Sequence, residues 1–258
     1  MISTSVTTAD LMPLLPELVL VGAAFALLLL DLFLSERQRV VVHVLSIATL
    51  IAVAGMLAMD VGGQGTVLNG MFIRDDMADV LKWVACVISA AALVYTWSFL
   101  RERGLYKGEI PVLMLFSVAG MMLLISAGNL VMVYLGLEML ALCSYALVAI
   151  DRDSPLASEA AMKYFVLGSL ASGMLLYGMS LVYGATGSLD LAAIHSAATS
   201  MPMLLTGMVF MVAGIAFKFG AAPFHMWLPD VYHGAPTPIT LFIGAAPKLA
   251  AFAMAYRL

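Results

Sequence analysis

Five ionisable side chains lie inside or directly beside long apolar stretches of this sequence: Glu138, Lys163, Lys218, His225 and Lys248. In a lipid bilayer an ionisable group is costly to bury, so it is by default a candidate for function. A carboxylate, an amine and an imidazole can each bind and release a proton when burial and neighbouring charges tune them. Together they indicate proton or ion handling.

Lys218 lies in the segment FKFGAAPFHMWLPD (217–230), directly after an apolar run. Pro223 follows five positions later, and a proline in a helix removes one amide donor and clashes with the carbonyl four residues before it, here Phe219. The spacing therefore predicts a helix that breaks beside the lysine. Such breaks occur at membrane depth only where the freed backbone is buried in protein or faces water, as at transporter ion sites.

Lys248 repeats the arrangement, because Pro247 directly precedes it within PITLFIGAAPKLAAFAMA. This proline predicts a second break, which would free the carbonyl of Ile243. A lysine beside each break favours proton transfer over a side chain that simply extends to the membrane surface.

Glu138 lies near the middle of the apolar stretch 129–150, about 13 Å from one end and about 18 Å from the other. Its side chain is too short to reach water from there. We expect it to form a charge pair with Lys218, because each is too costly to bury alone. A protonated, hydrogen-bonded structural carboxyl is the alternative.

Lys163 and His225 are weaker candidates. Ser158 could cap the helix that carries Lys163, and a lysine that close to a helix start could equally extend to the membrane surface. His225 could relay protons between Lys218 and Lys248, or it could be a hydrogen-bonded structural histidine.

The elements that carry these residues are membrane-spanning helices, because the chain is 63% hydrophobic and 11% charged, with a mean hydropathy of +1.04. We expect an all-α polytopic bundle of about eight transmembrane helices, the seventh and eighth broken. Three other charges in the spans, Glu17, Asp79 and Lys82, lie within a turn or two of a helix end and favour an interfacial position. The predicted spans are 13–34, 40–59, 77–99, 110–127, 129–150, 160–184, 201–223 and 236–256.

Basic residues in alternate loops predict the orientation. The loops after the second, fourth and sixth spans hold only Arg74, which places the N-terminus outside and the basic loops in the cytoplasm. The Gly-rich stretch 60–70 is then an outer loop, expected to form a short hairpin or turn. The loops after the first, third and fifth spans hold Arg37, Arg39, Arg101, Arg103, Lys107 and Arg152.

Composition also excludes several classes of protein. The net charge of −4 is spread thinly, which gives no basic surface for nucleic acid. Cys86 and Cys143 lie 57 residues apart in apolar runs and favour core packing over redox or metal chemistry. The first span carries Glu17 and has no preceding Lys or Arg, so we expect a retained helix and no signal peptide. No Rossmann glycine pattern, flavin site or iron–sulfur cysteine set is present.

The segments FKFGAAPFHMWLPDVYHGAPTPITLFIGAAPK (217–248) and KYFVLGSLASGMLLYGMSLVYGATGSLDL (163–191) resemble the antiporter-like subunits of respiratory complex I, NADH-quinone oxidoreductase. The resemblance covers residues 110–258. It implies a proton-translocating subunit built from two inverted five-helix repeats, of which this chain carries one half. Residues 1–109 would be three N-terminal helices, and 110–258 the proton-translocating repeat. Glu138, Lys163, Lys218, His225 and Lys248 match the family's proton-transfer positions.

The same resemblance implies partners and a location. The partners would be other membrane subunits of complex I in the bacterial inner membrane, with FMN and iron–sulfur clusters in partner subunits. NAD and quinone would be substrates of the complex. A cation/proton antiporter subunit without a redox partner, and a scaffold with an inert channel, are the alternatives.

Overall fold

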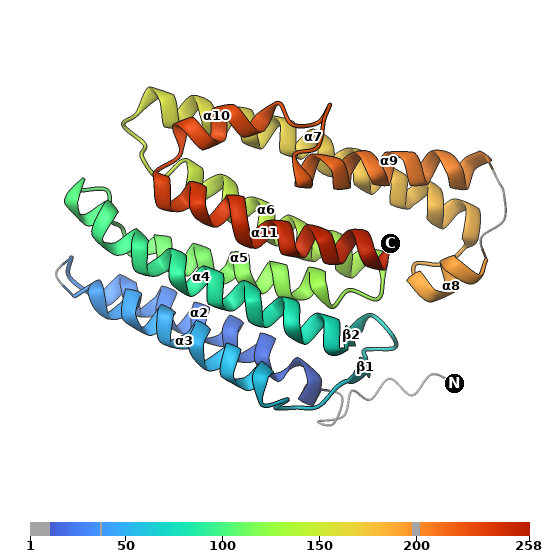
Figure 1. Ribbon diagram of the computed structural model, residues 1–258, viewed down its shortest axis with the longest axis horizontal. Coiled ribbons are helices and arrows are strands. Elements are labelled where there is room, and N and C mark those ends of the chain that lie inside the picture. The colour runs from blue at the N-terminus through green and yellow to red at the C-terminus, as the bar shows by residue number, and fades with distance from the viewer. Residues whose placement is uncertain (1–10, 37, 198–201) are drawn as a thin grey trace.

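The computed structural model describes residues 11–36, 38–197 and 202–258 as a bundle of helices with one short hairpin (Figure 1). The helices are η1 (Met12–Leu14), α2 (Leu15–Phe33), α3 (Val40–Ala58), α4 (Asp76–Glu102), α5 (Glu109–Ile125), α6 (Leu130–Val148), α7 (Pro155–Thr186), α8 (Leu191–Ser196), α9 (Pro202–Phe219), α10 (Trp227–Gly234) and α11 (Thr237–Arg257), and the strands are β1 (Gly65–Val67) and β2 (Phe72–Arg74).

Seven helices in the described part of the chain are long and apolar enough to cross a membrane: η1 with α2, α3, α4, α6, α7, α9 and α11. The eighth predicted span corresponds to α5, which has 17 residues and is about 25 Å long. This helix is the most buried of the bundle and packs against α2, α4, α6 and α11. The all-helical membrane fold is thus confirmed, with one of the eight predicted spans shorter than the others.

The helices form two packed groups joined by α11. The helices α2, α3, α4 and α5 lie side by side, and α7 packs along α9 on the opposite side of the bundle (Figure 1). Between them, α11 contacts α4, α5, α6 and α9. Small residues allow the closest approaches: a Cβ added at Gly120 would lie 2.6 Å from the Leu140 amide nitrogen, and one added at Gly178 would lie 2.7 Å from the Gly207 carbonyl oxygen.

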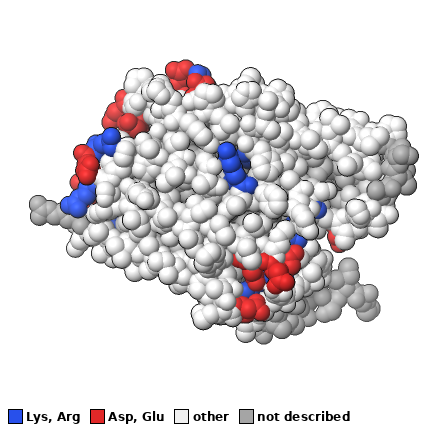
Figure 2. Space-filling view, in the orientation of Figure 1, with Lys and Arg blue, Asp and Glu red and all other residues white. Residues whose placement is uncertain are grey.

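The two ends of the bundle differ in their connections. At one end, which we call the hairpin end, β1 pairs antiparallel with β2, with Gly65 opposite Arg74. The predicted hairpin after the second span is therefore confirmed. At the other, the basic end, lie the described residues 34–36 and 38–39 of the first loop and the loops 103–108 and 149–154. Arg37, counted above among the cytoplasmic arginines, lies outside the described residues. On the face shown in Figure 2, most charged side chains gather toward the ends, and a basic side chain reaches the surface in the middle of the largely uncharged area between them.

The predicted break beside Lys218 is present, but its cause differs from the prediction. Helix α9 ends at Phe219, and Gly220 follows with φ +70°. The Ala221 amide donates to the Ala216 carbonyl at 2.9 Å and the Gly220 amide to the Phe217 carbonyl at 3.0 Å, which together form a Schellman cap. The helix therefore ends at the left-handed glycine, three residues before Pro223.

The predicted break at Pro247 is wrong. Helix α11 continues from Thr237 to Arg257 with Pro247 inside it. A proline removes only one backbone hydrogen bond, and the residues around it, such as Ile243, Ala246 and Ala250, are buried against neighbouring helices that hold the helix together.

The helix that carries Lys163 begins earlier than the sequence suggests. The Ser154 hydroxyl, and not that of Ser158, accepts the capping bond, from the Ala157 amide at 3.3 Å. Pro155 occupies the first helical position. The lack of an amide donor costs nothing there, because the first amides of a helix have no carbonyl partner within the helix. Lys163 consequently lies in the third turn of α7.

Candidate functional site

Lys218 lies at the C-terminal end of α9, one residue before the helix stops. The last carbonyls of a helix carry partial negative charge, which favours a cation at this point. Glu138 lies near the middle of α6, and its carboxylate is close enough for its charge to act on the Lys218 amine. Both side chains are partly buried.

The expected direct pair between Glu138 and Lys218 is not formed. Within the described residues, no ion pair at 4.0 Å or less includes either side chain. Glu138 Oε1 is buried without a hydrogen-bond partner among the protein atoms described. The two groups therefore act on each other only through their charges, and within the described residues Glu138 Oε1 is left free to accept a proton or a hydrogen bond.

An aromatic cluster holds the chain where α9 ends. Trp227, the first residue of α10, donates from Nε1 to the Phe217 carbonyl oxygen at 3.0 Å. Its ring stacks on Tyr164 of α7 with centroids 4.8 Å apart and planes 13° from parallel. Tyr145 of α6 packs edge-on against Tyr164 at 4.7 Å. This contact needs Gly168, because a Cβ there would collide with the Tyr145 hydroxyl. Three helices thus fix the backbone beside Lys218.

Lys248 lies near the middle of α11, the helix between the two packed groups. Like Lys218, it takes part in no ion pair within the described part of the chain. Arg257 anchors the far end of the same helix: its guanidinium donates to Asp75 at 3.0 Å and to the Ile125 carbonyl oxygen at 2.6 Å.

Lys163 has two acidic partners. Its amine lies 2.8 Å from Glu159 one turn earlier on α7, and 3.0 Å from Asp230 on α10. The pairing with Asp230 joins α7 to the short helix after the break. Asp230 is the last residue of the sequence WLPD, which begins α10, and its pairing with Lys163 was not predicted from the sequence.

His225 lies in the segment between α9 and α10 and is exposed. The structure therefore brings Glu138 and Lys218 within range of each other's charge, and places Lys248 on an adjoining helix. It sets Lys163 apart in an ion pair with Asp230.

Sequence reasoning also missed a buried charge group at the hairpin end. Lys82 of α4 is fully buried and its amine lies 2.6 Å from the carboxylate of Glu17 on α2. Arg74 of β2, also buried, donates to Asp79 at 2.8 Å. The interfacial position expected for Glu17, Asp79 and Lys82 is thus wrong for the first and last. The opposite charges on neighbouring spans were the available signal.

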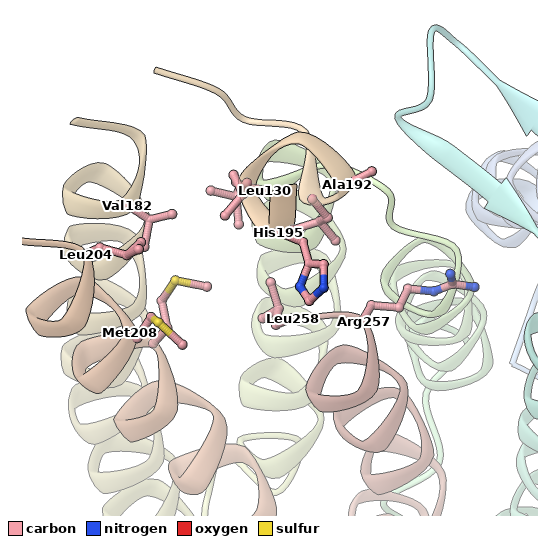
Figure 3. Close-up of a pocket in the computed structure, with 11 residues that line it drawn as sticks. Leu130, Val182, Ala192, His195, Leu204, Met208, Arg257 and Leu258 are labelled. Carbon is pink, nitrogen blue, oxygen red and sulfur yellow. The ribbon is translucent and has the colours of Figure 1, made fainter. Parts of the chain in front are cut away.

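None of the candidate residues lines the cavity of 320 Å³ at the hairpin end between α8, α9 and the end of α11 (Figure 3). Its walls are mainly apolar, with His195 facing it, whereas Arg257 points away from it. Across residues 11–36, 38–197 and 202–258, no three His, Cys, Asp or Glu side chains come together as metal ligands would.

Comparison with known sequences places these features in a family. The sequence model of the family described as NADH:quinone oxidoreductase/Mrp antiporter, TM, matches residues 127–258, which include all five candidate residues. NADH-quinone oxidoreductase subunit N of Xanthomonas euvesicatoria pv. vesicatoria (strain 85-10) is 68% identical over 255 residues, which are 98% of this chain and 52% of that protein. The chain spans about half the length of the curated relatives it matches.

Solved structures agree with this comparison. A chain of respiratory complex I from Thermus thermophilus with bound Aureothin has a TM-score of 0.81 and 32% identity, over 94% of this chain and 53% of that one. A chain of the Mrp complex from Dietzia sp. DQ12-45-1b shares the fold, with a TM-score of 0.76 and 23% identity over 98% of this chain and 48% of that one. With more than half of its residues covered by the family's sequence model, the chain belongs to the NADH:quinone oxidoreductase/Mrp antiporter transmembrane family.

Proposed function

We propose that the chain carries one half-channel of subunit N of NADH-quinone oxidoreductase and moves protons across the membrane, driven by electron transfer from NADH to quinone in other subunits. Glu138, Lys218 and Lys248 are the main proton-binding groups, and Lys163 and His225 serve the path at its ends. The observation that carries the proposal is the position of Lys218. This lysine lies where the apolar helix α9 ends, the charge of Glu138 acts on its amine, and it forms no ion pair within the described residues.

The chemistry follows from this geometry. A lysine without a direct counter-ion in apolar surroundings loses its proton more readily than one in water, and a nearby carboxylate opposes that loss. Protonation of Glu138, or movement of α6 relative to α9, changes this balance. Lys218 can then release a proton toward Lys248 and later take up another.

The finer architecture belongs to the same proposal. Residues 110–258 form one of two inverted five-helix repeats, and residues 1–109 supply three additional helices. The subunit lies in the bacterial inner membrane with its N-terminus and hairpin end outside, beside other membrane subunits of the complex. FMN and the iron–sulfur clusters reside in partner subunits. The identity to subunit N and the fold shared with a chain of complex I support this arrangement.

The test is proton pumping by the assembled complex in inverted membrane vesicles, where NADH addition drives acidification of the interior. Glu138→Gln keeps the size of the side chain and removes its ability to bind a proton. We expect it to slow NADH oxidation coupled to pumping while the complex assembles in normal amount. Glu109→Gln, at an exposed carboxylate near the basic end, is the matched control. Loss of assembly in Glu138→Gln alone would make Glu138 a structural carboxyl.

A cation/proton antiporter subunit without redox partners is the second candidate, favoured by the fold shared with the Mrp complex. Deletion of the gene distinguishes the two. Loss of NADH-dependent quinone reduction supports the complex I subunit, whereas loss of sodium tolerance with intact NADH oxidation supports the antiporter.

A further inference from the structure

A second acid–lysine pair lies outside the family match, among the three N-terminal helices. The Lys82 side chain is 0% exposed and that of Glu17 is 4% exposed, and their charged atoms are 2.6 Å apart. Burying both partners of an ion pair removes their hydration, and that loss often equals or exceeds their mutual attraction. An apolar pair would hold α2 against α4 at least as well. Packing alone therefore does not explain why both charges are buried here.

The surroundings of the pair are balanced in charge. Asp79 lies one helical turn before Lys82 on α4, and Arg74 of β2 donates to Asp79 at 2.8 Å. The four buried or nearly buried groups thus comprise two cations and two carboxylates. Phe72 places its ring 4.7 Å from the Lys82 amine, and Cys86 lies one turn further along α4. The charges that act on Lys82 are those of Glu17, Asp79 and Arg74. None of them comes from the described side chains of α3, α5 or α11.

A cleft at the hairpin end reaches one member of this group, Asp79. It has a volume of 400 Å³, and its lining includes Asp60, Asp76 and Asp79. Asp60 lies 3.4 Å from Arg74, and Gln64 donates to Asp76 at 2.7 Å. Asp79, 12% exposed, lines this cleft and lies one helical turn before the buried Lys82 on α4.

We propose that Glu17 and Lys82 form a proton-exchange site that opens through Asp79 to the water at the hairpin end. In the resting pair Glu17 is a carboxylate and Lys82 an ammonium. Transfer of one proton breaks an N–H bond of Lys82 and forms an O–H bond on Glu17, which leaves a neutral amine and a neutral acid. The amine then takes up a proton from inside the bundle, on the side where α11 packs against α4, and Glu17 releases its proton to the water in the cleft by way of Asp79. Each cycle binds and releases one proton, with no other reactant.

This inference deepens the proposed function and rests on it, because the site acts in proton movement by the same subunit. It adds a titrating group that lies close to the outer water when the hairpin end faces outside. Glu138, Lys218 and Lys248, in contrast, belong to α6, α9 and α11.

The first test uses the unmodified complex. A hydrophobic carbodiimide reacts with protonated carboxyl groups in apolar surroundings, and mass spectrometry of the digested subunit locates the modification. We expect Glu17 to be modified progressively faster as the pH falls, and the Asp79→Asn variant to lose most of that pH dependence. Exposed Glu109 reports general reactivity of the reagent. A Glu17 that stays unmodified across the pH series would overturn the proposal, since the pair would then be a permanent ion pair.

The second test is the charge-balanced double variant Glu17→Gln with Lys82→Met, compared with Glu109→Gln with Arg152→Gln, an exposed pair 3.4 Å apart. We expect the buried double variant to assemble and oxidise NADH, with fewer protons moved per NADH, while the exposed one matches the wild type. If the buried double variant moves as many protons per NADH as the wild type, the Glu17–Lys82 pair is only a structural contact. If the buried variant fails to assemble, the carbodiimide result decides alone.

Lys218→Met, measured alongside, separates this inference from the proposed function. Loss of pumping in Lys218→Met with normal pumping in the buried double variant removes the inference and leaves the function. Normal pumping in Lys218→Met removes the function itself.

Discussion

At the scale of single residues, the informative property of Lys218 is that its charge is stabilised only indirectly. The C-terminal carbonyls of α9 and the field of Glu138 favour the ammonium, and no carboxylate contacts it within the described residues. A lysine held this loosely can change its protonation state when a neighbour changes charge. Lys163, by contrast, has two carboxylates within 3.0 Å and is held as a cation.

Lys218→Arg tests whether the residue supplies a proton or only a charge. Arginine keeps the positive charge, but a guanidinium has a pKa above about 12 and stays charged even when buried. We expect pumping and coupled NADH–quinone turnover to fall at least about tenfold, as for loss of a proton-transfer group. The measurement needs vesicles in which the variant complex is shown to assemble. Near-normal pumping would mean that Lys218 acts as a fixed counter-ion.

At the scale of elements, the end of α9 is set by backbone hydrogen bonds and by one indole. Gly220 closes the Schellman cap, and Trp227 supplies a second donor to the Phe217 carbonyl. The indole reaches that carbonyl because it is stacked on Tyr164 and because Gly168 leaves room for Tyr145. The aromatic cluster thus decides where the Lys218 backbone lies.

Trp227→Phe should loosen this arrangement while preserving most of the packing. Loss of one buried hydrogen bond costs about 1 kcal/mol, which corresponds to roughly fivefold faster amide hydrogen exchange for residues 217–221 where local opening governs exchange. Trp97→Phe is the control, because Trp97 of α4 packs against His43 of α3 and Tyr106 of the loop 103–108, away from the break. Equal exchange rates at 217–221 in wild type and Trp227→Phe would contradict a positioning role.

Most of these elements could be predicted from sequence, since runs of apolar residues reveal their spans without knowledge of packing. The sequence could not show which residue ends α9, because Gly220 and Pro223 are both typical of a helix end. The backbone shows that Gly220 ends it first. The break predicted at Pro247 is absent because the buried residues around this proline keep α11 continuous, and burial is not visible in the sequence. Glu17 and Lys82 were misplaced because depth along a helix does not show which face is buried.

At the scale of the whole molecule, the proposed orientation in the membrane rests on the excess of basic residues in the loops of one end. Those loops connect α2 to α3, α4 to α5 and α6 to α7, so all three lie at the basic end of the bundle. The hairpin and its acidic cleft lie at the opposite end. The proposed direction of proton movement depends on which end faces the cytoplasm.

Cysteine labelling tests the orientation. In a protein without Cys86 and Cys143, a cysteine within 103–108 should react with a membrane-impermeant maleimide only from the cytoplasmic side, and one within 62–69 only from outside. Reverse labelling would invert the topology and assign the acidic cleft to the cytoplasm. Labelling of both positions from one side would contradict the number of spans between them.

Asp75 contacts two long helices at once. Its carboxylate accepts from the Ala78 amide at the start of α4 and from Arg257 at the end of α11, so one side chain joins the hairpin ends of two long helices that pack side by side. Lys82 lies seven residues from this joint and Lys248 nine residues from Arg257, about 10 Å and 13 Å along the two helices. Because α11 also packs against α4, the joint at Asp75 limits how far one helix can slide past the other and so fixes the register between Lys248 and Lys82.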